Sequence, residues 1–303
     1  MTRRLDVVRL WSLAFTLLAG GAVLAMAVYL GVASWPVLRG EGLSFLTGND
    51  WAFRKERFGA AAMLYGTAVV SGIALLLAAP VGIGTALFAS EVCPPRLRLA
   101  VKLLVELLAG IPSVVYGLLG VVFLRTVMSD LFERLRWDAP SGDTLLTAGV
   151  LLAVMVLPTV ATLSDDALQS VPSSVRDAAR GLGLTRAEAV HGVVLPAAAP
   201  GLLSALLLAL GRALGETIAV FLVVGRAENR LPDSLFSLAP LVDAGQTLTS
   251  KLGGAEPTIA LGDPLHTAAI LGLGLLLLAV VLALSLGAGA LRARLALAQA
   301  HRP

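Results

Sequence analysis

Charged residues are nearly absent from six long stretches of this sequence, and these stretches limit what the chain can fold into. A transmembrane α-helix needs roughly 20 apolar residues to cross about 30 Å of hydrocarbon. Each stretch is long enough, and they cover residues 10–38, 58–90, 97–124, 144–164, 195–225 and 264–291. Of all residues, 57% are hydrophobic and only 14% are charged, against about 25% charged in soluble domains. The sequence therefore predicts an all-α integral membrane protein with six transmembrane helices.

Basic residues predict the orientation of these helices. Arg3, Arg4 and Arg9 stand directly before the first stretch, and basic residues that flank the first helix usually stay in the cytoplasm. The stretch is longer than the apolar core of a signal peptide and no convincing cleavage site follows it, so we expect an uncleaved anchor. With six helices, both termini are then cytoplasmic, and the inner loops carry slightly more Lys and Arg than the outer loops.

Two long segments fall on the outer side in this topology. Residues 34–57 contain two tryptophans and a cluster of charges at 54–57. They predict an amphipathic helix on the outer membrane surface, a contact for a soluble partner, or a solvated loop with interfacial aromatic residues. Residues 229–263 are rich in Pro, Gly, Ser and Thr, so we expect irregular structure there and a surface suited to contact a receptor.

A polar segment with two helix-start signals joins the fourth and fifth stretches. Ser174 with Asp177, and then Thr185 with Glu188, have the spacing of a capping box. In this motif a hydroxyl accepts a backbone N–H and an acid stands three residues further on. The pattern predicts that two helices begin within this one segment.

Two glycines, Gly181 and Gly183, lie between these helix starts. We expect the first helix to stop there and the chain to bend through conformations that suit glycine. The second helix then continues into the fifth apolar stretch. Ala178 and Ala179 give the first helix a small, flat apolar face, which suits a groove on a partner better than lipid. The alternative is a loop with an amphipathic surface helix.

Two charges, Arg212 and Glu216, fall inside the fifth apolar stretch. A charge within the membrane costs about 2.5 kcal/mol or more unless it faces a cavity or a partner. Because the two residues are four apart, they are expected to pair on one helical face. The pair either anchors the helix bundle or serves an oxyanion, since the fork of guanidinium donors matches the oxygens of phosphate.

Pro112 interrupts the third apolar stretch, and Ser113 and Tyr116 follow it. The freed backbone groups need neighbours or water in a cavity, so the two hydroxyls are candidates to meet a dehydrated anion. The alternative is a helix kink in which each hydroxyl bonds back to the backbone. Glu106, one turn after Lys102, is expected to pair with that lysine and would repel an anion.

Several kinds of chemistry are not indicated by the sequence. None of the lysines belongs to a phosphate-binding Gly-Lys-Ser/Thr loop, so ATP would have to be hydrolysed by another chain. His191, His266 and His301 are too scattered for a metal site, and no hydrolase motif is present. The single cysteine, Cys93, cannot form an internal disulfide. We therefore expect a transport subunit without a cofactor or enzymatic activity of its own.

The polar segment resembles the cytoplasmic loop motif of ABC importer permeases, whose short coupling helix fits a cleft on the ATPase subunit. The matching residues are Asp177, Ala178, Ala179, Gly181 and Leu195-Pro196, with Asp177 in place of the usual Glu. Residues 106–117 and 211–217, and residues 65–67 with 80–84, are similar to the permeases of phosphate importers, more to the PstC type than to the PstA type.

This resemblance implies a six-helix permease with the type I ABC importer fold, in the plasma membrane of a bacterium or archaeon. It implies an anchor and first outer loop at 1–64, a transmembrane domain at 65–291 with a coupling loop at about 165–194, and a cytoplasmic tail at 292–303. The residues expected to couple to the ATPase are Ser174, Asp177, Ala178, Ala179, Arg180, Gly181 and Gly183. Those expected on the substrate path are Arg212, Glu216, Thr217, Ser113 and Tyr116.

The implied partners are a homologous second permease of the PstA type, a pair of PstB-type ATPase subunits that hydrolyse ATP, and an extracytoplasmic phosphate-binding protein of the PstS type. The implied function is the import of inorganic phosphate. A permease for molybdate, sulfate or phosphonate, or an ATP-independent secondary transporter, is the alternative.

Overall fold

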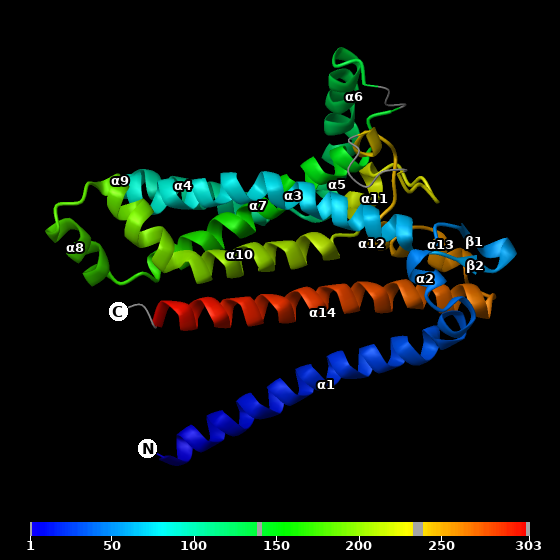
Figure 1. Ribbon diagram of the computed structural model, residues 1–303, viewed down its shortest axis with the longest axis horizontal. Helices are drawn as coiled ribbons and strands as arrows, with labels where there is room; N and C mark the ends of the chain where they lie inside the picture. The colour runs from blue at the N-terminus through cyan, green and yellow to red at the C-terminus, as the bar shows by residue number, and fades with distance from the viewer. Residues whose placement is uncertain (1, 138–140, 233–238, 301–303) are drawn as a thin grey trace.

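A bundle of long helices that run in nearly the same direction forms the body of the protein (Figure 1). The computed structural model describes residues 2–137, 141–232 and 239–300. The long helices are α1 (Thr2–Glu41), α3 (Ala61–Leu87), α7 (Leu145–Gln169), α10 (Leu195–Gly215) and α14 (Pro264–Ala300). By length and composition, six helical stretches of the described chain can cross a membrane, which confirms the predicted fold class.

Shorter elements connect the long helices. On either side of α3 lie α2 (Ser44–Thr47), β1 (Trp51–Ala52), η1 (Phe53–Lys55), β2 (Arg57–Phe58), the π-helical turn η2 (Phe88–Val92) and α4 (Pro95–Ala109). Before α10 lie α5 (Ser113–Leu119), the π-helical turn η3 (Gly120–Leu124), α6 (Arg125–Arg134), α8 (Ser173–Gly181), α9 (Arg186–Ala189) and the π-helical turn η4 (Val190–Val194). Before α14 lie α11 (Ile218–Val223), η5 (Ala239–Leu241), α12 (Leu248–Leu252) and α13 (Glu256–Ile259).

The third candidate span begins at Ser113, and the prediction of one helix over 97–124 is wrong. Ile111 precedes Pro112, whose ring disfavours helical backbone at the preceding residue, so the helix is divided there. The part before the break is α4, a separate amphipathic helix that packs against α7. The part after it continues through η3 into α6, which projects steeply away from the bundle (Figure 1).

The fifth candidate span covers Arg186–Gly215, earlier in the chain than the predicted residues 195–225. Its start confirms that the second helix of the polar segment runs into the span through α9 and η4. Its end differs because Glu216 has an extended backbone, with φ −71° and ψ 121°, which stops α10. The remainder of the predicted span forms the separate short helix α11.

Small residues allow α3 and α7 to pack closely in the main core. A Cβ atom added at Gly82 would lie 2.7 Å from Cγ1 of Val160, and one added at Gly149 would lie 2.6 Å from Cγ2 of Ile73. Glycine is therefore required at both positions for this helix spacing. The same core includes Ala74, Ala78 and many aliphatic residues of α7, α10 and α11.

The first helix, α1, stands apart from the rest of the bundle. It meets α14 near the end that carries β1 and β2, and the two helices diverge toward their opposite ends (Figure 1). Trp11, Phe15 and Leu17 are among its many exposed apolar side chains. Lipid is the solvent for such a surface, so the exposure is compatible with a membrane anchor.

The end of the bundle that carries β1 and β2, here called the hairpin end, is closed by a compact cap. β1 and β2 pair antiparallel, with Trp51 opposite Phe58, and both side chains are buried against α12, α13 and α14. The predicted amphipathic helix on the membrane surface is therefore not what residues 34–57 form. The predicted irregular structure at 229–263 is confirmed in its described part, where three short helices are joined by loops.

A buried ion cluster holds this cap together. Nζ of Lys251, whose side chain is only 1% exposed, lies 3.1 Å from Oε2 of Glu256 and 2.5 Å from Oε1 of Glu228. Oε1 of Glu256 accepts a hydrogen bond from Nε1 of Trp51 at 2.8 Å and lies 2.9 Å from Nε2 of His266. Burial raises the pKa of Glu256, but the hydrogen bond from Trp51 and the charge of Lys251 outweigh it and hold the pKa below its ordinary value.

The opposite end of the bundle, here called the α8 end, carries both α8 and α9. The N-terminus and the C-terminus lie toward this end (Figure 1), as an even number of spans requires. α14 remains helical through residues 292–300, which were expected to form a tail, and residues 301–303 of that expected tail lie outside the described residues.

Candidate functional site: coupling helix and substrate path

α8 is a two-turn helix that begins directly after Pro172. Pro172 has φ −55° and ψ 141°, and Ser173 is the first helical residue, so Ser174 lies inside the helix. The predicted capping box of Ser174 and Asp177 is therefore wrong. Oδ1 of Asp177 instead lies 3.3 Å from Nη1 of Arg180, and both side chains are exposed.

The bend after α8 depends on Gly183 and not on Gly181. Gly183 has φ +80°, a left-handed conformation that strongly favours glycine, whereas Gly181 is the last residue of α8 and has no such backbone. Around the bend, the N–H of Gly183 donates to O of Arg180 at 2.9 Å, and the N–H of Leu184 donates to O of Ala179. The chain thus reverses tightly before the next helix begins.

The second helix of the polar segment starts with a complete capping box, as predicted. Oγ1 of Thr185 accepts from the N–H of Glu188, and Oε2 of Glu188 accepts from the N–H of Thr185 at 2.8 Å. This start fixes the direction in which α9 leaves the bend. α9 continues through η4 into α10, so the polar segment is mechanically continuous with a membrane span.

The side chains of α8 are divided between two faces. The exposed face contains five of the residues expected to couple to an ATPase: Ser174, Asp177, Ala178, Arg180 and Gly181. Ala179, also expected on that face, is buried. The apolar surface at α8 is therefore Ala178, surrounded by polar side chains, together with the exposed Leu182 directly after the helix.

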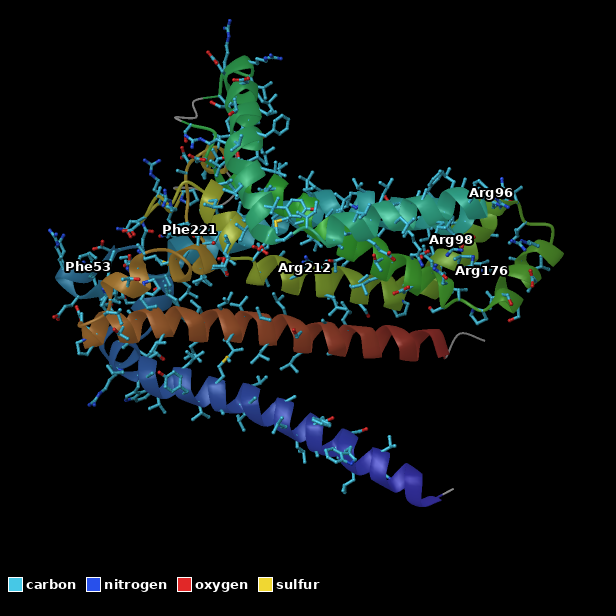
Figure 2. All side chains as sticks on the ribbon, turned by 180° about the vertical axis from the view of Figure 1, so that it is seen from behind. Phe53, Arg96, Arg98, Arg176, Arg212 and Phe221 are labelled. Carbon is cyan, nitrogen blue, oxygen red and sulfur yellow. The ribbon has the colours of Figure 1, made fainter. Side chains whose placement is uncertain are left out.

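Arg212 lies about midway along the bundle, between Phe221 and the group formed by Arg98 and Arg176 (Figure 2). Its side chain is exposed, and Nη1 donates to Oγ1 of Thr159 on α7 at 3.0 Å. Within the described residues, the guanidinium has no carboxylate at ion-pair distance. Its remaining donors are therefore available to a ligand.

The predicted pairing of Arg212 with Glu216 is wrong. α10 ends at Gly215, so the helical spacing that would place the two side chains together is lost. Oε1 of Glu216 instead accepts from the N–H of Ala219 at 3.3 Å, at the start of α11. Thr217 lies in the same break and donates to O of Gly215 at 3.2 Å.

The break after α4 uses one of the two hydroxyls proposed for an anion. Tyr116 is buried and its hydroxyl donates to O of Leu108 at 2.8 Å, across the interruption at Pro112. Its proton is therefore committed to the backbone, as in the helix-kink alternative. Ser113, the first residue of α5, is half-buried beside a groove of about 570 Å³ that includes Glu106, Gly110 and Pro112.

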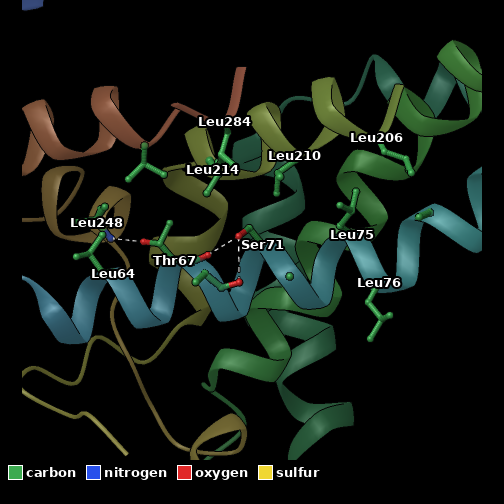
Figure 3. Close-up of a pocket in the computed structure, with 14 residues that line it drawn as sticks. Leu64, Thr67, Ser71, Leu75, Leu76, Leu206, Leu210, Leu214, Leu248 and Leu284 are labelled. Carbon is green, nitrogen blue, oxygen red and sulfur yellow. Dashed lines mark hydrogen bonds between the residues drawn. The ribbon is translucent and has the colours of Figure 1, made fainter. Parts of the chain in front are cut away.

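A pocket between three of the long helices does not suit an anion. It is a cavity of about 640 Å³ between α3, α10 and α14, and most of its lining is leucine (Figure 3). Its two hydroxyls are already bonded inside the protein: Thr67 accepts from the N–H of Leu248 at 2.9 Å, and Ser71 donates to O of Thr67 at 2.6 Å. A dehydrated phosphate would find no free donor there.

Charges at the α8 end form contacts that the sequence did not predict. Asp165, buried near the end of α7, lies 3.3 Å from Nη2 of Arg98 and 3.1 Å from Nζ of Lys102. Lys102 therefore does not pair with Glu106 as expected, because the buried carboxylate of Asp165 needs the compensation more than the exposed Glu106 does. An acid at the end of an otherwise apolar helix was the signal in the sequence.

These features define a class of protein: a multi-pass helical membrane protein with interrupted helices and an exposed polar helix, α8, at one end. The family described as "Binding-protein-dependent transport system inner membrane component" matches residues 78–297. The chain belongs to this family.

Relatives with curated names are similar over most of the chain. A Phosphate transport system permease protein PstC of Mesorhizobium japonicum is 40% identical over 262 residues, which are 82% of this chain and 77% of that protein. A protein of the same name from Pasteurella multocida is 38% identical, over 74% of this chain and 73% of that protein.

Solved structures of ABC transporters share the fold. A bacterial alginate ABC transporter, in complex with a periplasmic protein bound to an alginate pentasaccharide, has a TM-score of 0.59 at 19% identity and covers 93% of this chain and 94% of its own. The MetNI methionine ABC transporter in an inward-facing conformation has a TM-score of 0.58 at 17% identity, over 76% of this chain and 93% of its own. At these identities the likeness concerns the fold alone.

Proposed function

We propose that this chain is the permease subunit of an ATP-driven importer of inorganic phosphate. The observation that carries the proposal is the 40% identity to a PstC phosphate permease over 82% of the chain. The geometry agrees with it, because an exposed polar helix joined to a membrane span is what a permease needs to take force from a separate motor. The chain forms part of the path and does not itself hydrolyse ATP.

The arrangement of the two ends supports a full set of partners. α8, α9 and the diverging ends of α1 and α14 lie at one end, which we assign to the cytoplasm together with both termini (Figure 1). A PstB-type ATPase pair docks there on the exposed face of α8. A PstS-type binding protein delivers phosphate to the hairpin end, and a PstA-type permease completes the path within the plasma membrane.

Arg212 is the residue we assign to the phosphate path. Its guanidinium is exposed, lies within the span Arg186–Gly215 and is held only by the neutral hydroxyl of Thr159 among the described residues. A planar fork of donors suits the oxygens of phosphate, and the lack of a competing carboxylate leaves it electrostatically available. Glu216, Thr217 and Ser113 border the adjacent helix breaks and are assigned to the path with it.

Uptake of radiolabelled phosphate in cells tests this function. Arg212→Gln is expected to reduce uptake strongly while the protein still assembles with its partners, and Arg39→Gln, which changes an exposed arginine at the end of α1, is the matched control. Excess molybdate, sulfate or phosphonate should not compete.

Uptake by Arg212→Gln at the rate of the control would exclude Arg212 from the path. Competition by another oxyanion would mean that the proposed substrate, phosphate, is wrong. Uptake by the purified chain alone, without ATP, would instead identify a secondary transporter.

A further inference from the structure

Arg176 is the charged residue of α8 that turns toward the membrane bundle instead of toward the surface. Its side chain is 20% exposed, against 67% for Arg180 four residues later on the same helix. Nη1 of Arg176 pairs with Oε1 of Glu91, and Nη2 donates to O of Leu168 at 2.6 Å. Figure 2 shows Arg176 near Arg98 at the α8 end of the bundle.

One guanidinium therefore joins three elements that are far apart in the sequence. Glu91 lies in η2, which ends the span that begins with α3, and Leu168 is in the last turn of α7. The carbonyl oxygen of Leu168 is among the last four of its helix, which cannot complete the usual helical hydrogen-bond pattern. It accepts from the N–H of Val171 at 3.3 Å and, at shorter distance, from Arg176, which also places its positive charge at the negative end of the helix dipole of α7.

The other contacts of α8 are small and apolar. Val175 is half-buried and packs against a cluster that contains Leu168 and Val171, and Ala179 is buried where α8 packs on α9 and η4. Apolar contacts of this kind have no preferred direction, so they allow one surface to slide over another. A bidentate guanidinium fixes both distance and direction, because its donors lie in one rigid plane. The contact of Asp177 with Arg180 connects α8 only to itself.

We propose that Arg176 is a positioning residue that transmits the displacement of α8 to the ends of α3 and α7 through Glu91 and the Leu168 carbonyl. α3 and α7 form the tightly packed centre of the bundle, so a force applied at both of their ends moves them as one body. Arg176, which contacts the bundle through an ion pair and a hydrogen bond, is thus distinct from the exposed residues of α8 that would meet the ATPase. This inference rests on the proposed docking of an ATPase on α8.

The experiment uses the complete transporter, with both permeases and the ATPase pair, in proteoliposomes with the binding protein. The variants are Arg176→Gln, Arg176→Lys and Glu91→Gln. Arg96→Gln, at the exposed start of α4 at the same end of the molecule, is the control. The readouts are the amount of ATPase retained in the complex, the ATP hydrolysed and the phosphate imported per ATP.

Arg176→Gln is expected to retain the ATPase and its hydrolysis of ATP. The phosphate imported per ATP should fall on the order of tenfold, the factor that corresponds to the free energy of one charge-assisted hydrogen bond. Glu91→Gln should have a similar effect, because it removes the charge at the other end of the contact. Arg176→Lys keeps the charge but not the planar fork, so it should fall between the wild type and Arg176→Gln. Arg96→Gln should match the wild type.

A distance measurement separates transmission from simple loss of structure. Spin labels at Ser173→Cys on α8 and Val92→Cys on η2, in a Cys93→Ser background, report the movement of the two elements relative to each other. With Arg176 present, their separation should stay constant when nucleotide is added. In Arg176→Gln it should change, because α8 follows the ATPase and η2 does not.

Two results would overturn the inference. One is wild-type phosphate import per ATP in Arg176→Gln, and the other is loss of the ATPase from all three variants, which would make the contact purely structural. Failure of the proposed function looks different: the wild-type permease itself would then bind no ATPase.

Discussion

Gly183 offers a sharp test of how the bend after α8 is built, because Gly181 provides a matched control two residues away. At Gly183 no atom lies within 4 Å of an added Cβ, so alanine there would meet no neighbour and would cost only backbone strain. Holding a residue with a side chain in the left-handed region at φ +80° costs roughly 1–2 kcal/mol. Alanine at Gly181 meets no neighbour either, and its helical backbone favours alanine over glycine by about 0.5–1 kcal/mol.

Hydrogen exchange of the permease in lipid nanodiscs measures this strain directly. The amide of Leu184 donates to the carbonyl of Ala179 across the bend, and the amide of Leu182 donates to that of Ala178 directly before it, so both report its opening. In Gly183→Ala their protection should fall about 5- to 30-fold, the factor that corresponds to 1–2 kcal/mol. In Gly181→Ala it should stay the same or rise. Equal loss of protection in both variants would refute the assignment of the bend to Gly183 and would favour the pattern-based expectation that both glycines are needed.

Three further predictions concern the cap and the core. Lys251→Met leaves Glu256 buried without its cation and should destabilise the cap at the hairpin end by about 3–5 kcal/mol. The measurement is the rate of proteolysis of the outer loops, which should rise. An unchanged rate would mean that the ion cluster adds no stability. The pKa of Glu256 is lower in the folded protein than its ordinary value, so its contribution to the stability of the cap is present above the ordinary carboxyl pKa and is lost as the pH falls through the lower folded value. Protection of the cap from proteolysis should therefore persist at pH 5 and decline only in stronger acid. A loss of protection between pH 7 and pH 5 would contradict this direction. Gly149→Val should push α7 away from Ile73 and lower the thermal unfolding temperature. Gly84→Val, where an added Cβ meets no neighbour, should lower that temperature less. A larger decrease for Gly84→Val would contradict the packing of α3 on α7.

The spans were predictable because lipid imposes a simple requirement on sequence. A helix in hydrocarbon needs a long apolar run, and such runs are visible without any knowledge of contacts. The capping box of Thr185 and Glu188 was also predictable, since both partners lie within one turn. By contrast, the start predicted at Ser174 failed because Pro172 is the N-cap and fixes the entry to the helix two residues earlier.

Contacts between distant segments could not be predicted from local patterns. Trp51 and Glu256 are 205 residues apart, and nothing near either residue indicates the other. Arg212 and Glu216 looked like a pair because a continuous helix was assumed, and the break at Gly215 removes the geometry on which the pairing depended. No local pattern in the sequence distinguishes Arg176, because its contacts are with Glu91 and Leu168, which belong to other helices.

The central claim is that this chain has no motor of its own and takes force from a separate ATPase through α8. Site-specific photo-crosslinking in intact membranes tests it most directly, with a photoreactive side chain in place of Ala178 on the exposed face of α8. Leu43, exposed at the hairpin end, serves as the control position. The account predicts a crosslink from position 178 to the cytoplasmic ATPase and none from position 43. Crosslinks from position 178 only to lipid or to an extracytoplasmic protein would contradict it.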